Sequence, residues 1–263
     1  MAGHSQFKNI MYRKGAQDAK RAKLFTKLIR ELTVAAKTNP DPEANPRLRS
    51  AITAARTANM PKDTMERAIK KGAGNEAGTD FQEVRYEGYG PGGVAIIVEA
   101  LTDNRNRTAA EIRSIFNKQG GNMGETNSVS FQFDQLGALS FPLQGSDTPI
   151  DPETLFEATI EAGAQDMETH DENIEIYTAP DDLHHVLDTL AKSFAAPDKA
   201  RLIWKPNIHV DVNEEQFITI LKLLNALEDN DDVQMVFSNF EVDRLQPFSY
   251  KKLHKWRKKS AGG

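Results

Sequence analysis

Apolar positions near the start of the chain recur at helical spacing. Residues 15–37 follow the i, i+3, i+4, i+7, i+11 pattern of one helix face, which is formed by Phe25, Leu28, Ile29, Leu32 and Ala36. Three prolines in residues 38–46 end this helix. Asn45 followed by Pro46 then predicts the N-cap and first position of a second helix.

A third, short helix is predicted from the segment "NMPKDTMERAIKKGAG". Asp63 and Glu66 have the spacing of a capping box, and Gly72 suits the position just after a helix end. We therefore expect a small three-helix domain that closes near residue 78.

Beyond residue 79 the pattern changes to strands that alternate with helices. "VRYEGYG" and "VAIIVEALT" predict two strands around the Gly-rich corner 90–93, which we interpret as a tight turn. The next helix begins with Thr108 and Glu111 as a capping box and ends at Gly120. Further strands are predicted at 128–133, 138–143, 173–179, 200–205, 207–212 and 233–238, and further helices at 152–163, 181–195 and 213–229.

This order predicts a multidomain α+β protein. The N-terminal three-helix domain (1–78) is followed by two split β-α-β sandwich domains. The third domain (135–207) is inserted in the second (79–134 plus 208–242), and a basic tail (243–263) follows.

Charge is distributed unevenly along the chain, although the net charge of its 263 residues is only −5. Residues 1–78 carry 16 Lys and Arg against 7 Asp and Glu, whereas residues 79–242 carry 10 against 30. Residues 243–263 carry 7 against 1. Basic segments at both ends favour a polyanionic partner, although a basic segment can also dock on the protein's own acidic part.

Composition argues against several classes of protein. No apolar run approaches the roughly 20 residues that span a bilayer, so we expect no membrane association. The chain has no cysteine and no secretory signal pattern, so we expect a cytoplasmic protein. Its six histidines lack metal-ligand spacing, and no nucleophile motif is present. We therefore expect no enzymatic activity, no metal or other cofactor and no small-molecule substrate.

The N-terminal segment has the composition of a phosphate-binding surface. Asp18 is its only acid before Glu31. Because the apolar helix face packs inward, the cationic face is expected to be free for a partner. If six of the cations contacted duplex phosphates, the log–log salt slope of binding would be about −5. The predicted nucleic-acid-binding residues are His4, Ser5, Lys8, Arg13, Lys14, Lys20, Arg21, Lys23, Lys27 and Arg30.

Two further segments are candidates for secondary contacts. In "DNRNRT", Arg105 and Arg107 can face a partner, or the segment can serve only as a helix cap. The tail interleaves aromatic and cationic residues, which suits either nucleic acid or a solubilising role. Its candidate residues are Lys251, Lys252, Lys255, Trp256 and Arg257.

Three segments of the chain closely resemble the YebC/PmpR family: residues 1–37, "ANMPKDTMERAIKKGAG" and "YEGYGPGGVAIIVEALTDNRNRTAAEIRSIFNKQGGNMG". The resemblance implies three domains, the third inserted in the second, and a non-enzymatic regulator of gene expression that binds promoter DNA or ribosomal RNA, with the ribosome as a further partner. Many relatives have a Trp after "GHS", where this chain has Gln6-Phe7, and residues 247–263 do not resemble the family's ending. A protein-interaction module without nucleic-acid contact is the alternative.

Overall fold

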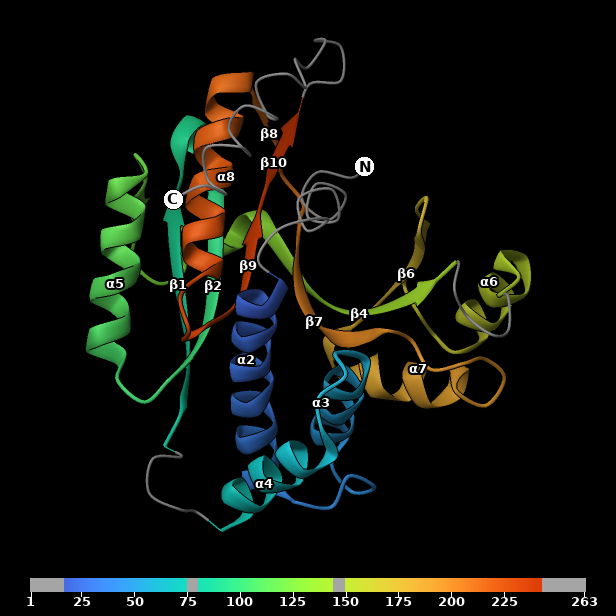
Figure 1. Cartoon of the computed structure of the whole chain (residues 1–263). Coiled ribbons are helices and arrows are strands. Elements are labelled where there is room, and N and C mark those ends of the chain that lie inside the picture. The colour runs from blue at the N-terminus through green and yellow to red at the C-terminus, as the bar shows by residue number, and fades with distance from the viewer. Residues whose placement is uncertain (1–16, 75–79, 144–149, 243–263) are drawn as a thin grey trace. The chain divides into compact units, whose positions relative to one another are not determined.

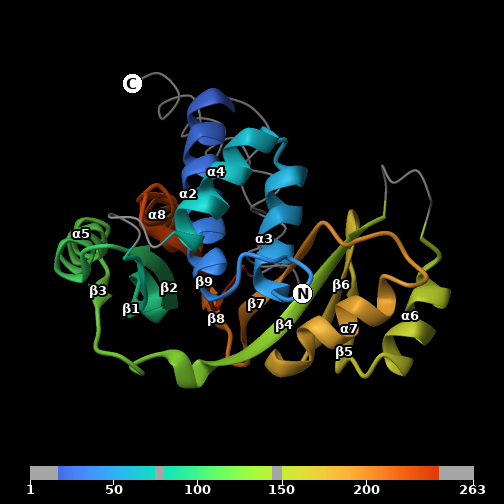
Figure 2. The same ribbon diagram turned by 90° about the horizontal axis from the view of Figure 1, so that it is seen from below.

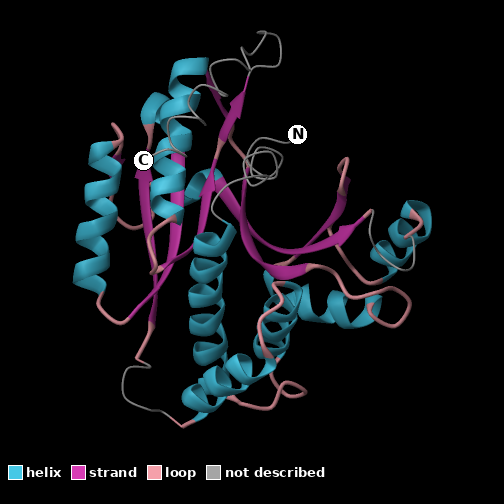
Figure 3. Ribbon diagram, viewed as in Figure 1, coloured by secondary structure: helices cyan, strands magenta, loops and turns pink. Residues whose placement is uncertain are grey.

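The computed structural model describes residues 17–74, 80–143 and 150–242 (Figure 1). Helices and β-sheets are both present, and the N-terminal helices precede the β-α-β regions (Figure 3), so the α+β prediction is confirmed. The described chain divides into two compact units. The first unit comprises residues 17–27, 80–133 and 206–242, and the second comprises 28–74, 134–143 and 150–205.

Three helices form the N-terminal region: α2 (Gln17–Thr38), α3 (Pro46–Thr57) and α4 (Lys62–Ala73). Leu32 and Ala36 of the predicted apolar face are fully buried. Asn45 caps α3 as predicted, because its side chain accepts a hydrogen bond from the backbone N–H of Leu48 at 3.0 Å. The same side chain donates to the carbonyl of Ala35 at 2.8 Å, which ties α3 to α2.

The predicted ends of α4 are wrong. The helix begins at Lys62 after Pro61 and has no side-chain cap, so Asp63 and Glu66 form no capping box. Gly72 lies inside the helix rather than after it. A Cβ at this position would overlap the backbone carbonyl oxygen of Thr33, so glycine serves the close approach of α4 to α2.

A four-stranded antiparallel sheet forms the centre of the first unit, with strand order β3-β1-β2-β9. The strands are β1 (Gln82–Tyr89), β2 (Ala95–Thr102), β3 (Asn122–Met123) and β9 (Val233–Ser238). The short helix η1 (Pro91–Gly93) forms the predicted corner between β1 and β2. Two short strands, β8 (Val210–Val212) and β10 (Phe240–Val242), pair in parallel.

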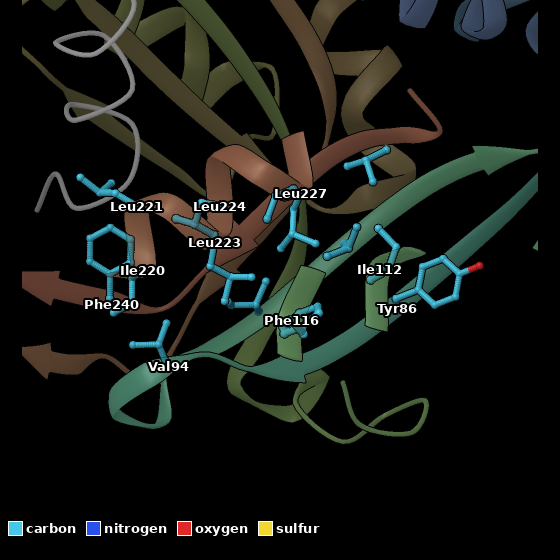
Figure 4. Close-up of a cluster of buried hydrophobic side chains, with 14 of the residues drawn as sticks. Tyr86, Val94, Ile112, Phe116, Ile220, Leu221, Leu223, Leu224, Leu227 and Phe240 are labelled. Carbon is cyan, nitrogen blue, oxygen red and sulfur yellow. The ribbon is translucent and has the colours of Figure 1, made fainter. Parts of the chain in front are cut away.

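Helices α5 (Arg105–Lys118) and α8 (Glu214–Glu228) cover one face of this sheet (Figure 2). Figure 4 shows the core between them, where the α8 side chains Ile220, Leu223 and Leu224 lie near Phe116 of α5. All of these side chains are at least 97% buried. The apolar periodicity of both helices is explained by this shared layer.

Two local predictions in the first unit are wrong. Helix α5 begins at Arg105 with Asn104 as its N-cap, so the proposed capping box of Thr108 and Glu111 does not exist. Residues 128–132 form no strand, because the short helix η2 (Ser130–Gln132) occupies half of the predicted segment, and the following strand begins only at Phe133. The predicted helix end at Gly120 is confirmed by its left-handed φ of 74° just after the C-cap.

The second unit contains a second four-stranded sheet, with order β5-β6-β4-β7. The strands are β4 (Phe133–Pro142), β5 (Asp166–Thr169), β6 (Asn173–Thr178) and β7 (Lys199–Pro206). Helices α6 (Pro152–Glu161) and α7 (Leu183–Leu190) pack on one face through a core that includes Phe141, Leu155 and Val186. Helix α7 is shorter than the predicted 181–195 at both ends, because the short helix η3 (Pro180–Asp182) precedes it and it stops at Leu190.

Candidate nucleic-acid interface

Helix α2 carries five of the ten predicted nucleic-acid-binding residues: Lys20, Arg21, Lys23, Lys27 and Arg30. Lys20 lies on the helix, but its side chain is outside the described set. The Arg21 guanidinium is exposed and lies 5.2 Å from the centroid of the Phe25 ring. A cation over the face of an aromatic ring is attracted by the ring.

Lys23 and Lys27 bind the C-terminus of α8. The Lys23 ammonium lies 2.9 Å from Oδ1 of Asp229, and the Lys27 ammonium donates to the carbonyl of Glu228 at 2.8 Å. The last carbonyls of a helix are unsatisfied and carry partial negative charge, so cations are favourable there. The expectation that the cationic face of α2 is free of internal partners is therefore wrong for these two lysines.

Arg105 and Arg107 lie in the first turn of α5, which begins before the predicted cap at Thr108. Arg105 is exposed. The Arg107 guanidinium donates to Oδ2 of Asp232 at 2.8 Å and to Asp103 at 2.9 Å. The hydrogen bond to Asp232 raises the pKa of Arg107. Arg107 thus has a structural role at the N-terminus of α5 in addition to any external contact.

Asp232 is the centre of a buried polar network. Its Oδ2 accepts hydrogen bonds from the hydroxyls of Thr108 at 2.6 Å and Thr102 at 3.3 Å, in addition to Arg107. Only 3% of Asp232 is exposed. The network joins β2, the start of α5 and the turn before β9, which explains why a threonine stands at position 108.

Several predicted residues lie outside the described ranges. They are His4, Ser5, Lys8, Arg13, Lys14, Lys251, Lys252, Lys255, Trp256 and Arg257. Their roles remain predictions from the sequence.

Sequence reasoning missed a loop formed by residues 124–132 (the 124–132 loop), which three alternate residues of β1 hold in place. Arg85 donates to Oδ1 of Asn127 at 2.9 Å, and Tyr89 donates to the carbonyl of Ser128 at 3.1 Å. Between them, Glu87 accepts from the backbone N–H groups of residues 129 and 130 at 2.8 and 2.9 Å. The only signal in the sequence is the polar alternation Arg-x-Glu-x-Tyr in a strand.

Glu87 is a buried carboxylate, with none of its side chain exposed. Its Oε1 lies 2.9 Å from Nε of Arg85, so the charge is paired as well as hydrogen-bonded. Asn127 adopts a left-handed φ of 66°, and a Cβ on Gly124 would lie 2.5 Å from the Ser128 hydroxyl. The 124–132 loop is therefore anchored to β1 at residues 127–130.

A polar cluster on the sheet of the second unit was also missed. The Tyr177 hydroxyl donates to Glu175 at 2.7 Å, and Lys205 lies 2.9 Å from Glu168 and 3.7 Å from the Tyr177 ring centroid. Burial, followed by the charge of Glu175, raises the pKa of Tyr177. The phenol is therefore a hydrogen-bond donor rather than a base at neutral pH.

Clusters of metal ligands and membrane-spanning helices are features that would point to other classes of protein. Within residues 17–74, 80–143 and 150–242, no group of three or more His, Asp or Glu side chains is arranged to hold a metal ion. None of the helices in these ranges is both long and apolar enough to cross a bilayer.

Comparison with known proteins places the chain in a family. A model described as the TACO1/YebC protein N-terminal domain matches residues 5–75, and one described as the TACO1/YebC second and third domain matches residues 81–240. The chain belongs to the TACO1/YebC family. A relative from Zymomonas mobilis, named "Probable transcriptional regulatory protein", is 51% identical over 244 residues, which are 92% of this chain and 96% of the relative.

The fold of the TACO1/YebC family is also known from a crystal structure of a conserved hypothetical protein from Aquifex aeolicus. That protein is 48% identical, and the two structures align with a TM-score of 0.80 over 90% of this chain and 98% of the other. The predicted family resemblance is therefore confirmed by sequence and by structure.

Proposed function

We propose that this TACO1/YebC protein is a non-enzymatic, cytoplasmic regulator of gene expression that binds nucleic acid through the basic segment containing α2. The observation that carries the proposal is the gathering of cations on α2, within a segment of 16 basic and 7 acidic residues that precedes an acidic remainder. Clustered Lys and Arg neutralise phosphates and release counterions, which gives strong binding that depends steeply on salt.

The contacts of Lys23 and Lys27 with α8 are compatible with this role. The side chains of Lys23 and Asp229 are 42% and 70% exposed. Exposed ion pairs stabilise a fold by only about 0–1 kcal/mol. A nucleic-acid phosphate can therefore replace Asp229 at little cost, and the acidic partner holds the lysine in place until then.

The proposed ligand can be either of two nucleic acids, promoter DNA (the DNA arm) or ribosomal RNA (the RNA arm). The name of the Zymomonas relative supports a transcriptional role and hence promoter DNA. Residues 39–45 between α2 and α3 are longer than the turn of a helix-turn-helix, whereas residues 58–61 between α3 and α4 have that length, so the helix connections do not choose between DNA and RNA. Both arms use the same phosphate chemistry on the same helix.

The test is fluorescence anisotropy of the full-length chain with labelled duplex DNA and with labelled ribosomal RNA, each over a range of salt concentrations. The variant K20Q/K23Q/K27Q removes three charges from α2. We expect weaker binding and a log–log salt slope smaller in magnitude by about 2–3. The control R113Q/K118Q/K222Q removes three exposed charges from α5 and α8 of the first unit and is expected to keep the wild-type slope.

Each outcome has a defined meaning. Equal losses in both variants would show that only overall charge matters and would contradict a role for α2. No binding to either nucleic acid would favour the protein-interaction module. Co-sedimentation with ribosomes that is abolished by K20Q/K23Q/K27Q would select the RNA arm.

A further inference from the structure

Phe131 is the most exposed large apolar side chain in the described residues, with 65% of its surface accessible. It lies in η2, between residues that are held firmly. Val129 is fully buried, and the Gln132 side chain donates to Tyr89 at 3.3 Å and accepts from Asn239 at 2.9 Å. The exposure of Phe131 is therefore a property of an ordered segment.

The anchoring of the 124–132 loop is concentrated next to Phe131. The buried carboxylate of Glu87 binds the backbone N–H of Ser130, the residue immediately before the exposed ring. Burying a carboxylate is unfavourable unless it is paired and hydrogen-bonded. A buried charge that fixes the backbone beside an exposed aromatic ring indicates a ring positioned in advance for a ligand.

We infer that the 124–132 loop binds an unpaired nucleobase, with the Phe131 ring as the stacking surface. This inference rests on the proposed function and adds a second contact to it. Aromatic side chains stack on bases of any sequence, because every base has a π-face. Because the backbone beside the ring is anchored, less conformational entropy is lost when a base stacks on Phe131 than on a ring in an unanchored loop.

The charge of the surrounding segment suits this ligand. Residues 120–133 contain a single charged side chain, Glu125, in a region where acids outnumber bases by 30 to 10. The exposed hydroxyl of Thr126 and the side-chain NH₂ group of the exposed Asn127 are neutral groups that can bond to base edges. The 124–132 loop thus carries one negative charge of its own, and the exposed Asp134 is the next acid along the chain.

The exposed apolar surface around Phe131 is small, which favours a single nucleobase over a folded protein as its ligand. Asn207 donates its backbone N–H to the carbonyl of Gln132 at 3.0 Å, so the half-exposed Ile208 follows close to the loop. One aromatic and one aliphatic side chain fall well short of the roughly 800 Å² per partner of a stable protein interface.

The experiment uses the full-length chain, a labelled single-stranded RNA oligonucleotide and the same oligonucleotide with abasic sites. We expect F131A to weaken binding to the intact probe about 5- to 100-fold and to leave binding to the abasic probe unchanged. The matched control is F156A, which removes a ring that is 48% exposed on α6. Both variants are expected to unfold at the wild-type temperature, because neither ring is buried.

A spectroscopic measurement complements the affinities. In F131W, stacking by a base quenches the emission of the new indole, after subtraction of the wild-type signal from Trp204 and Trp256. Quenching by the intact probe but not by the abasic probe is the expected result. Equal quenching by both probes would overturn the inference.

The outcomes separate the inference from the proposed function. Wild-type affinity in F131A, with loss in K20Q/K23Q/K27Q, would overturn the stacking role alone and leave Phe131 as a candidate protein contact. Loss in F131A but not in the lysine variant would overturn the proposed role of α2 alone. No binding of the intact probe by the wild-type chain would overturn the stacking inference, and the proposed function would fall with it only if duplex DNA and ribosomal RNA also failed to bind.

Discussion

The ammonium nitrogen of Lys23 lies 2.9 Å from Oδ1 of Asp229, the C-cap residue of α8. The two residues are 206 positions apart in the chain. The Asp229 carboxylate therefore lies beside Lys23, a cation that we expect to bind a nucleic-acid phosphate. If Asp229 competes with nucleic acid for Lys23, the strength of this ion pair can be measured as a change in nucleic-acid affinity.

Changing Asp229 to Asn should strengthen nucleic-acid binding. The exposed pair is expected to be worth about 0.2–1 kcal/mol, so its removal should tighten binding by roughly 1.5- to 5-fold. Anisotropy titrations at low salt measure the effect. Asp211→Asn removes the same charge from an exposed position on β8 and serves as the control for overall charge. Equal gains in both variants would argue against a specific competition.

Gly72→Ala should destabilise the helical region. The added methyl group would overlap the carbonyl oxygen of Thr33 on the neighbouring helix α2, and overpacking of this kind costs about 1–3 kcal/mol. Urea unfolding followed by circular dichroism gives the free energy of unfolding. Gly74→Ala is the control, since Gly74 is exposed and has an ordinary φ of −79°. A neutral Gly72→Ala would show that α2 and α4 are not closely packed.

Glu87→Gln should loosen the 124–132 loop and lower stability. The neutral amide cannot pair with Arg85, and its NH₂ group replaces an acceptor oxygen. We expect a loss of about 2–4 kcal/mol in the free energy of unfolding. Hydrogen exchange of the amides of residues 129 and 130 should accelerate in parallel. Glu125→Gln neutralises an exposed carboxylate of the same loop and is expected to leave both measurements unchanged.

His184 should make stability depend on pH. Burial, followed by the charge of Arg49, lowers the pKa of His184 from its ordinary value of 6.5. None of the described residues hydrogen-bonds to its buried Nδ1, which also disfavours the protonated ring. The unfolded chain then binds more protons than the folded chain as pH falls below about 6.5. Stability is therefore complete above this pH and decreases below it.

Urea midpoints at pH 7.5 and 5.5 measure this dependence. The variant H184Q should reduce the difference between the two midpoints, whereas H185Q, which changes the exposed neighbouring histidine, should retain it. An unchanged difference in H184Q would assign the pH dependence to other groups.

The sequence predicted those elements whose signals are local. The periodicity of α2 identified Leu32 and Ala36 as buried, and Asn45-Pro46 identified the start of α3, because the cap and the helix are adjacent in the chain. The start of α5 was placed too late. Thr108 and Glu111 match a capping motif, but Thr108 is needed by Asp232, 124 residues away. A local rule cannot include such a partner.

The candidate site was less accessible to sequence reasoning for the same reason. Charge alone identified the cations of α2, but it could not show that Lys23 and Lys27 meet the end of α8. The alternation of residues 128–133 resembled a strand. In the structure, the Glu87 carboxylate accepts hydrogen bonds from the backbone N–H groups of residues 129 and 130. These groups are therefore not available to pair with a neighbouring strand.

The strand order of the first unit has a consequence for synthesis of the chain. The two neighbours of β2 are β1 and the edge strand β9, which the ribosome makes roughly 130 residues later, after all of the sheet formed by β4–β7. At about 5–20 residues per second, β2 waits roughly 7–25 s for that partner. During this interval its Ile- and Val-rich edge is open to pairing with other nascent chains. Slow translation between residues 103 and 232 should therefore promote aggregation, and a chaperone that covers strand edges should relieve it.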